Sequence, residues 1–230
     1  MVRLSTSLLV VAVSCLALPA CKRAADTAKT VEPPLKTPQE SGAQAEGGDR
    51  RVHEAANRCG QRIQEAAREH AANVRHMNEA KVLDMKEVTQ REQVEAKREV
   101  VRKFLASNEA FKSVVLSEET IFAEELAKRQ VPQARIESAV RGFQSSIPGK
   151  AITIRMRGTD QRIGDSALGA LDFLDETWGQ WNYNKEYEQV QFSPPGALKK
   201  YTEFMEAIEA ASREQNELQE QLKAEGNASP

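Results

Sequence analysis

Residues 51–77 read RVHEAANRCGQRIQEAAREHAANVRHM, and this stretch decides the fold. It contains no proline, a single glycine, and many alanine, glutamate, glutamine and arginine residues, which favour helices. Its apolar residues recur every three or four positions, so they share one face of a helix. They are Val52, Ala56, Cys59, Ile63, Ala67, Val74 and Met77, and His70 falls at the gap in this stripe. We expect an amphipathic helix with His70 in or beside its core seam.

The helical composition continues from Arg50 to about residue 105, but the apolar stripe thins toward its end. Between Thr89 and Glu99 the only apolar residues are Val94 and Ala96. An unbroken helix of this length would be about 80 Å long at 1.5 Å per residue. The sequence therefore predicts either a long helix that projects beyond the core or a break near residues 86–92. The apolar stripe can pair with a second copy of the chain, as a homo-oligomer, or with its own bundle.

Shorter helices are expected in the rest of the chain. Ser117 is a candidate cap for one helix, and Pro132 suits the first turn of the next. Asp165 or Ser166 can cap a further helix, whose apolar stripe is Leu168, Leu171, Leu174, Trp178 and Trp181. A loop is expected at residues 182–184, and Ser193-Pro194-Pro195 marks the start of the last helix.

These segments predict an all-α fold, a helical bundle of four to six helices over residues 50–225 with one long N-terminal helix. Residues 151–157 alternate between apolar and polar side chains, which also allows a short strand pair with residues 188–192. The same residues 151–157 could equally begin the next helix. Residues 226–230 are expected to form a disordered tail.

The first 21 residues have a character of their own. Arg3 precedes an apolar run from Leu4 to Leu18, and the segment ends in Leu18-Pro19-Ala20-Cys21. A positively charged N-terminal region, an apolar stretch and a small residue before a cleavage site are features of a secretory signal peptide. With a cysteine at the cut, this segment resembles the lipobox signal peptide of bacterial lipoproteins.

The resemblance implies that residues 1–20 are removed and that Cys21 carries lipid. Pro19 departs from the family pattern, in which small or hydroxyl residues are commoner at that place. Three alternatives remain: a plain secretory signal that leaves Cys21 as a bare thiol, lipidation at Cys15, and an uncleaved anchor. The apolar run is shorter than the roughly 20 residues that span a bilayer. Residues 21–49, rich in proline and glycine, are expected to form a disordered tether.

The predicted location is the cell envelope. Lys22 follows the cysteine. In enteric lipoproteins an aspartate at this position resembles a signal for retention in the inner membrane. Because the aspartate is absent, the outer membrane, facing the periplasm, is favoured. The chain has 32 Lys and Arg against 34 Asp and Glu, and this balance argues against a nucleic-acid partner. The lipid bilayer, through acylated Cys21, and an unknown envelope protein are the expected partners.

Catalytic and metal-binding motifs are scarce. The three histidines, His53, His70 and His76, lack the i,i+4 spacing of paired metal ligands, and no cofactor motif is present. Cys59 is expected to be a small buried residue. One helix face carries carboxylates at i, i+3 and i+4, which we interpret as a solvated acidic face rather than a catalytic pair: Asp172, Asp175 and Glu176.

Both tryptophans and all three tyrosines lie between Phe173 and Phe204. They are expected to form the main core, with the alternative that Trp181, Tyr183 and Tyr187 form a partner or glycan surface. The preceding basic residues are expected at a solvated edge: Lys150, Arg155, Arg157 and Arg162.

The sequence predicts a non-catalytic, membrane-anchored envelope lipoprotein that acts through protein contacts. Two alternatives are an immunity-like lipoprotein that neutralises a toxin and a protein that binds or processes peptidoglycan.

Overall fold

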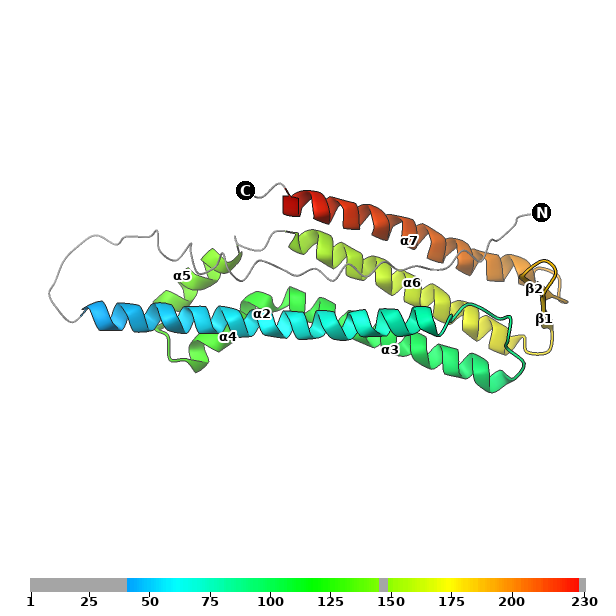
Figure 1. The fold of residues 1–230 in the computed structure, drawn as a ribbon, viewed down its shortest axis with the longest axis horizontal. Coiled ribbons are helices and arrows are strands. Elements are labelled where there is room, and N and C mark those ends of the chain that lie inside the picture. Colours follow the sequence, from blue (N-terminus) through cyan, green and yellow to red (C-terminus); the bar gives the residue numbers. More distant parts are fainter. Residues whose placement is uncertain (1–40, 145–148, 228–230) are drawn as a thin grey trace.

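A computed structural model describes residues 41–144 and 149–227. The predicted signal peptide, Cys21, most of the predicted tether and residues 228–230 lie outside the described residues. Within them the chain forms six helices and a two-stranded hairpin in an elongated bundle (Figure 1). The predicted helical bundle is therefore confirmed.

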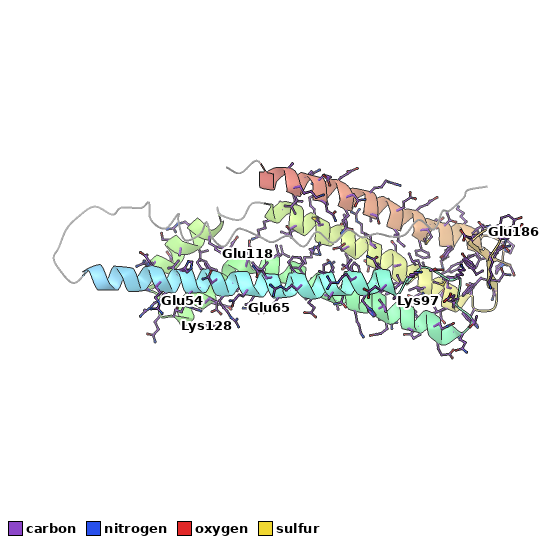
Figure 2. The ribbon with its side chains drawn as sticks, in the orientation of Figure 1. Glu54, Glu65, Lys97, Glu118, Lys128 and Glu186 are labelled. Carbon is purple, nitrogen blue, oxygen red and sulfur yellow. The ribbon has the colours of Figure 1, made fainter. Side chains whose placement is uncertain are left out.

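The first helical region is broken, as one of the two sequence alternatives predicted. Helix α2 (Ser41–Glu79) begins before the expected Arg50, and α3 (Arg91–Leu116) follows a turn. Lys97 of α3 donates from Nζ to the carbonyls of Ala80 at 3.1 Å and Lys81 at 2.8 Å, and thereby covers the end of α2 (Figure 2). The side-chain oxygen of Gln93 accepts hydrogen bonds from the backbone N–H groups of Thr89 and Gln90 and thereby fixes the start of α3. The chain can thus reverse without leaving these helix ends unsatisfied.

Two short helices follow α3. Helix α4 (Glu118–Lys128) begins directly after Ser117, and α5 (Gln133–Gln144) directly after Pro132, as expected. The expected side-chain cap by Ser117 is absent, because its Oγ instead donates to the carbonyl of Ser113 at 2.7 Å.

Helix α6 (Lys150–Glu176) decides between the two alternatives for residues 151–157 and corrects the predicted helix start at Asp165 or Ser166. Residues 151–157 form its first two turns rather than a strand, and the helix runs through Asp165 and Ser166 without a new start. The alternation in residues 151–157 was misleading, because Ile152 and Met156 are four apart and are buried together on one helix face.

The hairpin consists of β1 (Trp181–Asn184) and β2 (Gln189–Phe192), paired antiparallel. The extended segment near residues 188–192 is confirmed, but its partner is the segment that was predicted to be a loop. Trp181 pairs with Phe192 and Tyr183 with Val190, and these four side chains pack against the helices. Helix α6 therefore ends before Trp178 and Trp181 rather than passing through them. The last helix, α7 (Ala197–Asn227), starts just after Ser193-Pro194-Pro195.

Helix α2 packs against α3, α3 against α6, and α6 against α7. Helices α4 and α5 lie beside the N-terminal part of α2 (Figure 1). Two main hydrophobic cores result, and a third, smaller cluster of Ile152, Met156 and Leu218 joins the first turns of α6 to α7. The hairpin-end core includes Val74, Met77, Val94, Val101, Phe104, Ile163, Leu171, Leu174, Tyr201 and Ile208. The N-terminal core includes Ala55, Cys59, Ile63, Phe111, Val115, Ile121, Phe122, Leu126, Ile136 and Phe143. The apolar stripe of α2 thus packs within its own bundle, and Cys59 is buried as predicted.

Helix α6 can lie close to α7 because Gly169 has no side chain. A Cβ placed there would lie 2.6 Å from Cε1 of Phe204 on α7. Gly158, on the same helix, would meet no atom within 4 Å.

We expect Gly169→Ala to be less stable than Gly158→Ala by about 1–3 kcal/mol, because only the first overpacks the α6–α7 contact. Both variants gain the same helix propensity, so their difference isolates packing. Urea denaturation of the two variants measures it, and equal midpoints would contradict the close contact.

Candidate functional site: a buried polar layer

A layer of polar side chains crosses the bundle between its two cores. Each of the four packed helices contributes: His70 from α2, Ser107 and Asn108 from α3, Arg157 and Asp160 from α6, and Gln215 from α7. All six side chains are buried, and Asn108 and Asp160 are fully buried. We call these six residues the polar layer.

The position of the layer follows from the sequence. On each helix the polar residue occupies a place where the apolar stripe would otherwise continue. His70 lies between Ile63 of the N-terminal core and Val74 of the hairpin-end core. In the same way, Ser107 lies between Phe104 and Phe111, which belong to different cores. The layer is therefore an interruption that all four helices share.

Asp160 is the centre of the layer. Its Oδ2 lies 3.0 Å from His70 Nε2 and 2.9 Å from Arg157 Nη1, and its Oδ1 accepts from Gln215 Nε2 at 2.6 Å. A buried carboxylate is tolerable only when charges and hydrogen bonds replace water around it. Here α2, α6 and α7 each supply one partner, so this single side chain joins three helices.

His70 was predicted to lie in the core seam, and this is confirmed. Its ring packs between Phe104 and Phe111, with centroids 5.4 and 6.1 Å away. Burial lowers the pKa of His70 below its ordinary value, although the hydrogen bond to Asp160 opposes that effect. The neutral ring must donate from Nε2, because a carboxylate can only accept. Its Nδ1 is then an acceptor and lies 3.3 Å from Ser107 Oγ, whose hydroxyl donates to the carbonyl of Phe104 at 2.8 Å.

Arg157 was expected at a solvated basic edge, and that prediction is wrong. Its guanidinium is buried, lies 5.0 Å from the centroid of the Phe111 ring and faces Asp160. Burial lowers its pKa, and the carboxylate of Asp160 acts in the opposite direction. Lys150 and Arg162 also form ion pairs, with Glu118 at 2.7 Å and with Glu214. Arg155 alone of the four is exposed without an ion pair among the described residues.

The layer contains the residue types of a hydrolytic triad, but its geometry differs. In such triads the serine contacts Nε2 of the histidine, the aspartate contacts Nδ1, and the serine must reach a substrate. Here the two contacts are exchanged, with Ser107 at Nδ1 and Asp160 at Nε2. Ser107 does contact His70, yet it is 5% exposed and its Oγ also lies 2.8 Å from the carbonyl of Phe104. Its environment is the packed interior of the bundle. The arrangement is suited to linking helices.

The acidic residues at the end of α6 lie against α3. Asp175 contacts Arg91 Nε at 2.5 Å and Arg98 Nη1 at 3.3 Å, and Arg91 lowers its pKa. Asp172 contacts Arg98 Nη2 at 2.7 Å. The expectation of a fully solvated acidic face is therefore corrected, because the packing of α3 against α6 brings arginines to it. Of the three, Glu176 is exposed, whereas Asp172 and Asp175 are half-buried.

The three aromatic candidates are not equivalent. Trp181 is half-buried and donates from Nε1 to the carbonyl of Leu174 at 2.7 Å, and Tyr183 packs against the hairpin-end core. Tyr187, in the turn of the hairpin, is 62% exposed. The structure assigns the first two mainly to the core and leaves Tyr187 at the surface.

The described residues contain no group of three His, Cys, Asp or Glu side chains placed to hold a metal ion. Comparisons with protein-family models, with curated proteins and with solved structures give no match for this chain. The polar layer is therefore interpreted from its own geometry.

We expect Asp160→Asn to destabilise the protein by about 3–5 kcal/mol, because it leaves Arg157 buried without a counter-charge. Glu214→Gln is the matched control, since Glu214 also joins α7 to α6 through Arg162 but at the surface. Its cost should be at most about 1 kcal/mol. Urea denaturation at pH 7.5 compares the two, and similar small losses would show that Asp160 is not central.

Proposed function

We propose that this protein is a lipid-anchored lipoprotein of the cell envelope that acts through contacts with a protein partner, without catalysis. In this proposal Cys21 carries the lipid and the outer membrane, facing the periplasm, is the location. The observation that carries the proposal is the order of Arg3, the apolar run and Leu18-Pro19-Ala20-Cys21 at the start of the chain.

The described fold is consistent with an anchor outside it. No helix in residues 41–144 or 149–227 has both the length and the apolar character needed to cross a bilayer. Helix α2 starts at one end of the bundle, near Glu54, whereas the hairpin with Glu186 lies at the other end (Figure 2). At 1.5 Å per residue the 39 residues of α2 measure about 58 Å. An anchor at Cys21 would thus attach the chain at the end remote from the hairpin.

The hairpin end supports a contact surface for a partner. Among the described residues, three large apolar side chains are exposed, and two of them lie at this end: Tyr187 at 62% in the hairpin turn and Leu198 at 52% in the first turn of α7. The third, Leu116 at 53%, lies at the end of α3. Tyrosine is enriched where proteins bind one another, because its ring buries a large area and its hydroxyl can form a hydrogen bond. No comparable observation favours the immunity-like or peptidoglycan alternatives.

We expect Cys21→Ser to move the protein from the membrane fraction to the soluble fraction and to abolish incorporation of labelled palmitate. Cys15→Ser should change neither, because residue 15 would be removed with the signal peptide. Fractionation and labelling of both variants in the source organism provide the measurement. If the Cys21→Ser protein stayed in the membrane fraction and still incorporated labelled palmitate, the assignment of Cys21 as the anchor would be overturned.

We expect a photo-crosslinking amino acid at position 187 to yield one defined protein adduct in the envelope. The same amino acid at Glu65, exposed on α2, serves as the control and should yield no such adduct. Mass spectrometry of the crosslinked product identifies the partner. An adduct of equal yield at both positions, or none at 187, would contradict a contact at the hairpin end.

A further inference from the structure

We propose that the polar layer makes the packing of α2 sensitive to acid: protonation of His70 loosens the C-terminal half of α2 from α3 and α6. His70 is the only member of the layer on α2. The α2 side of the layer therefore depends on one titratable ring.

The charges around His70 are few and can be named. From α6 the ring faces Asp160 and Arg157, the two charged side chains that shift its pKa. From α3 it meets uncharged groups, namely Ser107 and the rings of Phe104 and Phe111. From α7 the layer receives only the amide of Gln215, which is bound to Asp160. With a neutral ring the layer holds one cation and one anion.

Protonation would leave two cations around one carboxylate. His70 Nε2 and Arg157 Nη1 both lie within 3.0 Å of the same oxygen, Oδ2 of Asp160. Hydrogen bonding does not oppose the proton, because Ser107 can donate to Nδ1 or accept from it while donating to Phe104. The free-energy cost is therefore that of burying an additional charge. That cost is avoided either if the ring stays neutral, which lowers its pKa, or if the packing around it opens to water.

The direction of the pH effect follows from linkage. Because folding lowers the pKa of His70, the unfolded or opened chain binds the proton more readily than the closed one. The contribution of the neutral ring is complete above pH 6.5 and is lost as the pH falls below 6.5 toward the folded pKa. Acid thus favours the opened form at this layer.

The N-terminal core should respond differently. Glu118, the first residue of α4, is buried and pairs with Lys150 of α6, and burial raises its pKa. A carboxyl group whose folded pKa is raised gains stability as the pH falls. The two cores are separated by the polar layer, so we expect α4 to remain closed under conditions that loosen α2.

Hydrogen exchange of the purified full chain at pH 7.5 and 5.5, expressed as protection factors, tests this proposal. In the natural protein, protection in residues 64–79 of α2 should fall about tenfold at the lower pH, while residues 118–128 of α4 keep theirs. His70→Gln should remove this change, because a neutral amide can still donate to Asp160 and accept from Ser107.

The other two histidines provide matched controls. His53 and His76 are exposed on the same helix, so His53→Gln and His76→Gln should retain the acid effect. Retention of the effect in His70→Gln, or its absence in the natural protein, would overturn the proposal.

A measurement on the natural protein covers the case in which His70→Gln does not fold. The ring signals of His70 should titrate in NMR spectra with a midpoint below 6.5, the ordinary value for histidine. A midpoint of His70 at or above that value would equally overturn the proposal.

Discussion

The structure depends on how one buried carboxylate is compensated. Asp160 has no exposed surface, and water is replaced by His70, Arg157 and Gln215, which come from three different helices. A charge in this position would be very costly without these partners. The relative positions of α2, α6 and α7 are therefore constrained far more narrowly than apolar packing alone requires, because apolar contacts tolerate sliding and aligned polar contacts do not.

This constraint also explains why the molecule has two cores. Four helices interrupt their apolar stripes at the same level, so the hydrophobic contacts on the two sides of the polar layer form separate clusters. Helices α2 and α3 pass through the layer and contribute to both cores. Hydrogen bonds from Lys97 and to Gln93 hold the turn between these two helices. The bundle as a whole is elongated (Figure 1).

The same arrangement separates the two ends of the molecule. The chain enters the described fold at the start of α2, and the hairpin with its exposed Tyr187 lies at the opposite end (Figure 1). In the proposed function these ends have different tasks, attachment and partner contact. The polar layer lies between them, where a change in the charge of His70 would act on the helix that connects both ends.

The sequence by itself determined the helices, because their signal is local. The three- and four-residue spacing around Cys59 predicted the fold class, and Ser117 and the prolines before α5 and α7 predicted where α4, α5 and α7 begin. The gap at His70 predicted a polar residue in the core. The proposed location in the cell envelope likewise comes from the sequence, through the lipobox-like segment that ends in Cys21 and lies outside the described residues. The same reasoning left residues 151–157 open between a strand and a helix, since seven residues are too few to separate a period of 2 from one of 3.6.

Only the tertiary structure decided which charges are buried. Arg157 was expected at a solvated edge and Asp160 was not singled out, because nothing within α6 distinguishes them from their neighbours Arg155 and Asp165. His70 and Asp160 are 90 residues apart in the chain and meet only when α2 and α6 pack through α3. The arginines that contact Asp175 are likewise distant in sequence. Periodicity identifies the face of a helix, but the partner of that face is set by long-range packing, and the partner determines whether a charge is solvated, paired or central to the fold.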